Sequence, residues 1–235
     1  MAAGLLARSG YFAGKDLHAP QPSNPKGFFE SFEINMINED ILRESAGDLI
    51  LPLKSKQLWL SQLPLEISIR STGAVNERIK KLVSNKPYCF KDPRFCYTLP
   101  AWKPFLDPDT VFLCVFRQPW KTALSIVREV ESRSYLQGVS MDFERAMGIW
   151  RACYQHILQM RQRGGSWVLM EYRQFFDESC LKKLENLLQT TLDRSFPEAM
   201  LENNALPQAI SAADEVLYQQ LCSLAGYPPD LVGGR

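Results

Sequence analysis

The chain has 235 residues, a formal net charge of +1, and 46% hydrophobic against 23% charged residues. This length suits one domain with a sizeable core, and the composition is typical of globular proteins. The net charge excludes the strong overall attraction to nucleic acids or anionic membranes that basic proteins have. Any anion site must therefore be built locally.

Domain organisation and location are inferred from the same features. No window reaches the ~20 apolar residues of a membrane span. The start of the chain lacks the apolar length and the cleavage pattern of a signal peptide. We expect a cytoplasmic protein with one domain over residues 1–227, a tail over 228–235, no membrane span and no nucleic-acid partner. The sequence does not indicate the oligomeric state.

Cysteines and histidines give no sign of a metal site. The six cysteines lie far apart, mostly in apolar runs, without a Cys-x-x-Cys pair or a Cys/His cluster. The two histidines are His18 and His156. This spacing favours buried thiols in a reducing compartment over disulfides or zinc ligands, and we expect no bound metal.

The N-terminal half predicts helices separated by irregular segments. Gly10 suits the position just past a helix end, and prolines and glycines make 14–27 a loop. Residues 46–63 are irregular. The predicted elements are helices over 2–9, 28–45 and within 64–84, a strand over 87–90, and a helix or turn ending at Trp102.

The C-terminal half alternates strands and helices. Residues 110–116 form the clearest strand, continuous, β-rich and apolar on both faces, and Pro119 suits the first turn of the helix that follows. The other predicted elements are helices over 119–131, 141–162, 178–190 and 211–224, and a strand over 167–170. Strands separated by helices favour an α/β fold with a parallel sheet and helices on its faces.

Three polar residues come just after a predicted strand: Lys91 and Arg117 follow their strands directly, and Tyr172 lies two positions past its strand. In open parallel sheets, ligands bind beyond the carboxyl ends of the strands. Ser125 lies eight positions after Arg117, about two turns into the next helix, so both side chains can reach one anion near the helix N-terminus. The alternative is a surface arginine and a small packed serine.

Lys91, Asp92, Pro93 and Arg94 concentrate three charges at a strand-to-loop junction. Pro93 restricts the backbone just after the predicted strand and so limits the movement of these charged residues. A lysine here can stabilise charge that develops on a transferred group by ~2–4 kcal/mol if water is excluded. The alternative is an exposed salt-bridge cluster that contributes at most ~1 kcal/mol.

Four segments, taken in chain order, resemble the sulfotransferase family that uses 3′-phosphoadenosine 5′-phosphosulfate (PAPS). They are Gly10–Asp16, Asn24–Glu30, Lys91–Arg94 and the pair Arg117 and Ser125. The resemblance covers about residues 4–175 and is closest to the bacterial branch. It implies a P-loop-like three-layer fold with a parallel sheet. It also implies PAPS as cosubstrate without a metal, and a hydroxyl or amine acceptor on a small molecule or glycan.

The resemblance also implies roles for individual residues. Arg117 and Ser125 match the residues that bind the 3′-phosphate, and Lys91 matches a basic position near the sulfuryl group. Tyr172 loosely matches a tyrosine near the nucleotide base. Glu30 fits the general base, with Glu33 and Asp92 as substitutes, whereas neither histidine matches a catalytic position. The alternative for Glu30 is a charge favoured by the helix dipole.

One family feature has no counterpart in the chain. Family members carry a strand and a Ser-Gly-Thr loop before the first helix, and residues 1–10 align with that helix. We therefore expect the first strand and the phosphosulfate loop to be missing. A mis-assigned start codon or a fragment would explain this absence. For a chain that starts at Met1, we expect weak PAPS binding and little or no catalysis. Gly10, Gly14 and Lys15 superficially resemble a phosphate loop, but their spacing is wrong and favours a helix cap.

Two other functions remain open. The first is a non-catalytic nucleotide-binding remnant or interaction protein of the same fold, and the second is a P-loop small-molecule kinase. The acceptor pocket is also open, because large aromatic side chains more often pack in a core than line a pocket. The aromatic candidates are Phe28, Phe29, Trp59, Trp102 and Tyr135.

Overall fold

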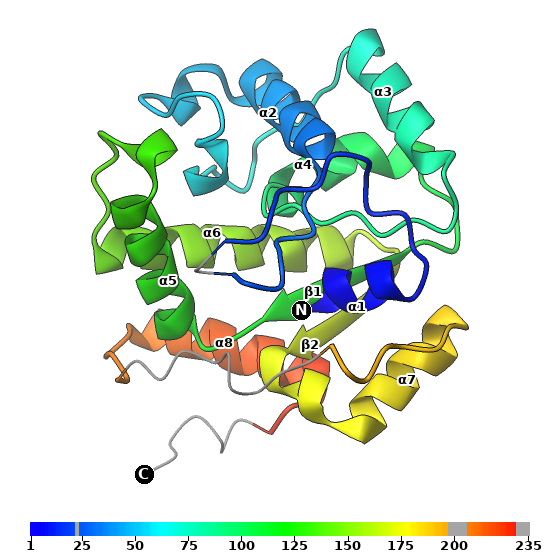
Figure 1. The fold of residues 1–235 in the computed structure, drawn as a ribbon. Coiled ribbons are helices and arrows are strands. Elements are labelled where there is room, and N and C mark those ends of the chain that lie inside the picture. Colours follow the sequence, from blue (N-terminus) through cyan, green and yellow to red (C-terminus); the bar gives the residue numbers. More distant parts are fainter. Residues whose placement is uncertain (22–23, 197–205, 229–235) are drawn as a thin grey trace. The chain divides into compact units, whose positions relative to one another are not determined.

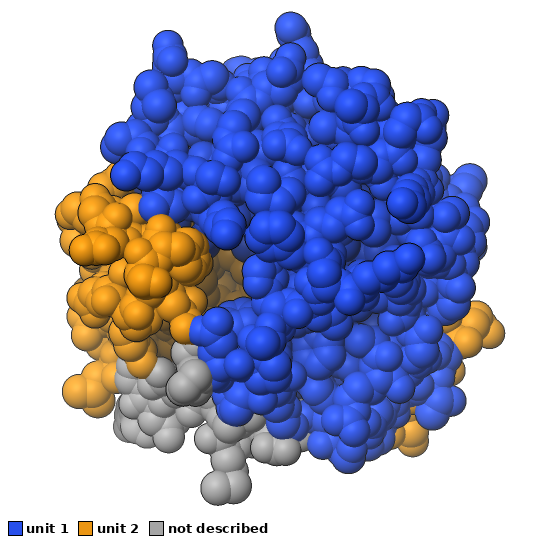
Figure 2. Space-filling view, turned by 45° about the horizontal axis from the view of Figure 1, so that its top comes forward, with its two compact units in different colours: residues 1–110, 190–196 blue, residues 111–189, 197–235 orange. Residues whose placement is uncertain are grey.

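The computed structural model describes residues 1–21, 24–196 and 206–228. The chain divides into two compact units, shown in blue and orange in Figure 2. Unit 1 comprises residues 1–110 and 190–196, and unit 2 comprises residues 111–189 with the described part of 197–235. The described residues contain eight α-helices and one two-stranded parallel sheet. The α/β class predicted from the sequence is therefore confirmed, and a single domain over 1–227 stays a prediction.

Unit 1 is built on helices whose ends are set by polar caps. Ser31 and Thr72 each accept a hydrogen bond from the backbone N–H three residues later, so the second and third helices begin directly after them. The helices of unit 1 are α1 (Ala2–Arg8), α2 (Phe32–Ala46), α3 (Gly73–Val83) and α4 (Phe95–Trp102). Its 3₁₀ turns are η1 (Gly47–Ile50), η2 (Leu58–Leu60) and η3 (Lys103–Phe105).

The core of unit 1 lies where α2, α3 and α4 meet. Ile34, Ile37 and Ile41 recur every three or four residues on α2, which places them on one face. This face packs against Ile79 of α3 and Trp102 of α4, all fully or almost fully buried. Trp102 is thus a core residue, as expected for large aromatic side chains.

The predicted strand over 87–90 is wrong. This segment makes one isolated parallel bridge, Phe12 to Tyr88, in which the Phe12 N–H donates to the Pro87 carbonyl at 2.7 Å. The pairing stops there because Gly10 and Gly14 on either side of Phe12 take φ values of +92° and +118°. Such left-handed backbone turns the chain away from an extended partner.

Unit 2 contains the sheet, and its two predicted strands are confirmed. β1 (Val111–Phe116) pairs in parallel with β2 (Ser166–Glu171), in a register that runs from Val111↔Ser166 to Phe116↔Glu171. Figure 1 shows the two strands side by side, with α8 beside β2. The helices of unit 2 are α5 (Pro119–Ser132), α6 (Phe143–Gln162), α7 (Glu178–Leu188) and α8 (Ala212–Ala225).

Cys114, Phe116 and Cys222 are buried in the core of unit 2. The Phe116 ring packs edge-to-face on Tyr154 and Tyr218. Burial raises the pKa of the Cys114 thiol to about 12 and that of the Cys222 thiol to about 11. These cysteines behave as small apolar side chains of the core.

Asp214 fixes α8 to α6 through a bidentate ion pair. Arg151 donates to its two oxygens at 2.6 and 2.8 Å, and Ser211 donates at 2.7 Å. Burial alone would raise the pKa of Asp214, but the hydrogen bonds from Arg151 and Ser211 outweigh it and lower the pKa. The pKa of Asp214 is therefore lower in the folded state than in the unfolded state. The ionised carboxylate stabilises the fold at pH values above the unfolded-state pKa, and this stabilisation is lost as the pH falls through the folded-state pKa.

We therefore expect Asp214→Asn to reduce the free energy of unfolding by about 1 kcal/mol at pH 7, since Arg151 is partly exposed. Urea denaturation at pH 7 and at pH 2 measures this loss. Glu215→Gln on the same helix turn is the control. The difference between the two variants should shrink at pH 2. A difference that is absent at pH 7 or unchanged at pH 2 contradicts this role.

Candidate functional site

The six predicted site residues fall into two groups, one in each unit. Glu30, Lys91 and Asp92 belong to unit 1, and Arg117, Ser125 and Tyr172 belong to unit 2.

Glu30 and Lys91 form an ion pair in unit 1. The Lys91 ammonium donates to Oε1 of Glu30, and the side chains are 44% and 15% exposed. Glu30 ends the 24–30 loop, in which Phe29 takes a positive φ of 53°, a strained conformation for a non-glycine residue. The Phe29 ring packs edge-to-face on Phe196 at 5.5 Å, which holds the loop in place. The structure thus brings together two residues that lie 61 positions apart.

Lys26 adds positive charge near Lys91. Burial, reinforced by the ammonium groups of Lys91 and Lys26, lowers the pKa of the α-amino group of Met1 to about 6. Both lysines therefore lie within electrostatic range of the start of α1. Lys26 also donates to the carbonyl of Phe196. This part of unit 1 suits an anionic ligand.

Asp92 is buried, and its carboxylate binds neighbouring side chains and backbone of unit 1. It accepts hydrogen bonds from Nδ2 of Asn35 at 2.6 Å, from the Arg94 backbone N–H at 2.7 Å and from Nη1 of Arg94 at 3.1 Å. Arg94 in turn donates to Glu39 through Nε at 2.8 Å. Burial alone would lower the pKa of Arg94, but Asp92 and Glu39 outweigh it and raise the pKa. The alternative of an exposed salt-bridge cluster is wrong for Asp92 and Arg94.

His18 joins this group through Asn35, a contact that no sequence pattern predicts. Its Nε2 lies 2.6 Å from Oδ1 of Asn35, the residue that also binds Asp92. The antiparallel bridge Leu17↔Ser31 sets His18 opposite Glu30, and the His18 N–H donates to the Glu30 carbonyl. Opposite residues of an antiparallel pair present their side chains on the same face. No periodic pattern links these residues, so sequence reasoning missed His18.

In unit 2, the strand register brings Arg117 and Tyr172 together. Each residue follows one member of the last pair, Phe116↔Glu171. Neighbouring parallel strands lie about 4.8 Å apart, so the two backbone positions are adjacent at the carboxyl ends of β1 and β2. This is the place where ligands bind in parallel sheets.

Tyr172 is held by the turn that it begins. Glu171 accepts a hydrogen bond from the Arg173 N–H at 2.6 Å, and Oε1 of Gln174 accepts one from the Glu171 N–H at 2.8 Å. This capping box fixes η5 (Tyr172–Phe176) at the end of β2. The Tyr172 ring then packs edge-to-face on Phe176 at 5.6 Å.

Arg117 folds onto the first turns of α5. Its Nε donates to the hydroxyl of Thr122 at 3.3 Å. Thr122 and Ser125 lie three positions apart on the helix and so share a face, and Ser125 is exposed. Gln118 makes no side-chain cap at the start of α5, and Pro119 follows it. Arg117, the face of Ser125 and the N-terminal end of α5 thus lie in one region of unit 2.

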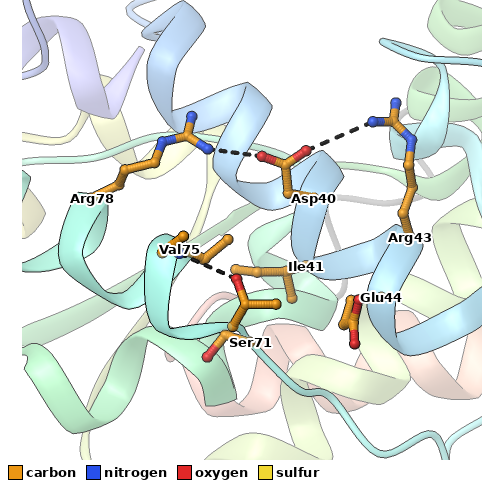
Figure 3. A pocket seen from close by; sticks show the side chains of 9 residues that line it. Asp40, Ile41, Arg43, Glu44, Ser71, Val75 and Arg78 are labelled. Atoms are coloured by element: carbon orange, nitrogen blue, oxygen red, sulfur yellow. Dashed lines mark hydrogen bonds and ion pairs between the residues drawn. The ribbon is translucent and has the colours of Figure 1, made fainter.

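A pocket of about 410 Å³ lies between α2 and α3 in unit 1 (Figure 3). Asp40 stands between two arginines, with Arg78 at 2.8 Å and Arg43 at 3.7 Å, so its rim charges already pair with one another. The lining residues are Asp40, Ile41, Arg43, Glu44, Ser71, Thr72, Ala74, Val75 and Arg78. None of the six predicted site residues is among them.

The described residues show neither a membrane-spanning helix nor a cluster of metal ligands. Within these ranges, no helix combines the length and the apolar character that crossing a membrane requires. The same residues contain no group of three or more His, Cys, Asp or Glu side chains arranged as metal ligands. Comparison with family models, with curated proteins and with solved structures gave no match for this chain.

Proposed function

We propose that the protein binds a 3′-phosphoadenosine nucleotide and transfers a sulfuryl group from PAPS to a hydroxyl or amine of a small molecule or glycan. The observation that carries this proposal is the arrangement of Arg117. This arginine leaves the carboxyl end of β1 beside Tyr172 and is held by Thr122 on the helix face that presents Ser125. A P-loop-like sulfotransferase fold is part of the proposal.

The group in unit 2 suits the nucleotide end of PAPS. A guanidinium forms strong, charge-assisted hydrogen bonds to phosphate oxygens. The N-terminal end of α5 adds partial positive charge, and the exposed Ser125 hydroxyl adds a neutral donor. In the proposal these three bind the 3′-phosphate, and the Tyr172 ring lies against the base.

The group in unit 1 suits the transferred group. Sulfuryl transfer is an in-line displacement that spreads charge over equatorial oxygens, so positioning and cationic stabilisation dominate catalysis. Lys91 supplies this cation, and Lys26 adds a second positive charge. Glu30 fixes the Lys91 ammonium through their ion pair. Asp92, buried against Asn35 and Arg94, positions the segment that carries Lys91.

Lys91→Ala is expected to slow sulfuryl transfer about 30- to 1,000-fold, because it removes ~2–4 kcal/mol of transition-state stabilisation. Release of 3′,5′-adenosine bisphosphate from PAPS, measured with protein in excess over PAPS and a panel of hydroxyl and amine acceptors, gives the rate. Lys81→Ala, a change at an exposed lysine of α3, is the control and should leave the rate unchanged.

Three outcomes of this assay separate the functions. Transfer that depends on Lys91 supports the proposal. Nucleotide binding without transfer to any acceptor favours a non-catalytic nucleotide-binding protein. Mg²⁺-dependent phosphoryl transfer from ATP favours a small-molecule kinase. Either of the last two results contradicts the sulfotransferase proposal.

A further inference from the structure

His18 is an exposed residue whose ring is nevertheless held in place. Nε2 lies 2.6 Å from Oδ1 of Asn35, and the ring packs edge-to-face on Phe32 at 6.2 Å. The backbone is fixed as well, since the His18 N–H donates to the Glu30 carbonyl at 2.9 Å. These contacts offset the conformational entropy that is lost when an exposed side chain is held in one orientation.

The hydrogen bonds of Asn35 determine which nitrogen of His18 carries the proton. Asn35 points Nδ2 at the Asp92 carboxylate, which accepts from it and from Arg94. Oδ1 of Asn35 therefore faces His18, and a carbonyl oxygen can only accept a hydrogen bond. Nε2 of His18 must be the N–H donor. In the neutral ring, Nδ1 then keeps its lone pair.

A ring oriented in this way is equipped to accept a proton. The arrangement is a base whose far nitrogen is held by a second group, which is held in turn by a buried carboxylate. Asn35 and Asp92 are both more than nine-tenths buried, so the two positioning groups are well fixed. Among the described residues, no hydrogen bond to Nδ1 of His18 is formed.

We propose that His18 takes the proton of the sulfuryl acceptor, with Nδ1 as the accepting atom and with Asn35 and Asp92 as positioning residues. This inference rests on the proposed sulfotransferase function. A lone pair of the acceptor oxygen or nitrogen forms the new bond to sulfur. The O–H or N–H bond breaks, its proton moves to Nδ1, and its electron pair stays on the acceptor atom. The bond from sulfur to the phosphate oxygen breaks, and 3′,5′-adenosine bisphosphate leaves with that electron pair.

The position of His18 relative to Glu30 favours this role. The two residues lie opposite each other and share a face, and Glu30 is the residue that pairs with Lys91. Oε1 of Glu30 already accepts from Lys91. The structure thus assigns the cation to Lys91, its anchor to Glu30 and the proton acceptor to His18.

The first test is independent of activity. Long-range ¹⁵N–¹H correlation spectra of the full chain report the tautomer of each neutral histidine ring, and His18→Gln assigns the His18 signals. We expect the Nε2–H tautomer for His18. Asp92→Asn can donate to Oδ1 of Asn35 and reverse its amide, and we expect a shift of His18 towards the Nδ1–H tautomer. An Nδ1–H ring in the unaltered chain overturns the proposal.

The second test is chemical rescue. His18→Ala should lower the rate of sulfuryl transfer about 10²- to 10⁴-fold, leave the affinity for 3′,5′-adenosine bisphosphate unchanged, and regain activity when free imidazole is added. Lys15→Ala, on the same loop and also exposed, is the control. Transfer at the full rate by His18→Ala, or a loss that imidazole does not restore, overturns the role of His18 alone. Absence of transfer by the unaltered chain, whatever the tautomer, overturns both proposals.

Discussion

Glu39→Ala is expected to lower the free energy of unfolding by about 3–5 kcal/mol, the cost of breaking a buried ion pair by removing one partner. The Glu39 side chain is fully buried, and that of Arg94 is 4% exposed. Oε1 of Glu39 accepts from Nε of Arg94 at 2.8 Å and forms an ion pair with Nη2 at 2.7 Å. Its carboxylate also accepts from the backbone N–H groups of Lys56 and Leu58. Alanine leaves these buried donors without their acceptor.

Chemical denaturation of the full chain measures this effect. Asp40→Ala is the matched control, because Asp40 is the next residue of α2 but is 37% exposed and pairs with Arg78 at the surface. The control should lose no more than about 1 kcal/mol. Equal losses in the two variants would show that the Glu39 and Arg94 pair is not a stabilising element of unit 1.

Arg117→Ala is expected to weaken binding of 3′,5′-adenosine bisphosphate about 10- to 150-fold. The reason is the loss of a charge-assisted hydrogen bond to the 3′-phosphate, which contributes about 1.5–3 kcal/mol. Isothermal titration calorimetry measures the dissociation constant. Arg128→Ala removes the same charge from an exposed position on α5, where Nε donates to the Leu124 carbonyl. It should change the affinity less than threefold, because an exposed charge at a distance is screened.

Thermal denaturation of Arg117→Ala separates a binding role from a structural one. The hydrogen bond from Arg117 to Thr122 is long, 3.3 Å, and partly exposed, so its loss should cost less than about 1 kcal/mol of stability. Unchanged affinity in a folded Arg117→Ala variant would remove this arginine from the nucleotide site.

The sequence predicts the helices and the two strands of unit 2 well, because each is specified by its own local pattern. Residues 110–116 are continuous and apolar, and they match β1 almost residue for residue. The helix expected within 64–84 starts only at Gly73, where Thr72 caps it. The strand expected over 87–90 depended on a partner elsewhere in the chain, and the glycines around Phe12 limit that pairing to one bridge.

The part of the candidate site that lies at the ends of β1 and β2 could be predicted from the sequence. The rule that ligands bind at the carboxyl ends of parallel strands selected Arg117 and Tyr172, and the register sets them side by side. Burial was not predictable, because charge alone does not reveal which side chains a fold encloses. Asp92 therefore looked like a reactive carboxylate, whereas it is enclosed with Arg94 and Asn35. The orientation of the His18 ring depends on Asn35, which in turn binds Asp92. No rule of residue spacing predicts such contacts.

The most direct measurement compares two nucleotides that differ by one phosphate. Titration calorimetry of the chain with 3′,5′-adenosine bisphosphate and with adenosine 5′-monophosphate isolates the contribution of the 3′-phosphate. If Arg117 and the start of α5 bind that phosphate, the bisphosphate should bind at least about tenfold more tightly, and Arg117→Ala should abolish the difference. Equal affinities for the two nucleotides, or a preference that survives Arg117→Ala, would contradict the proposed function.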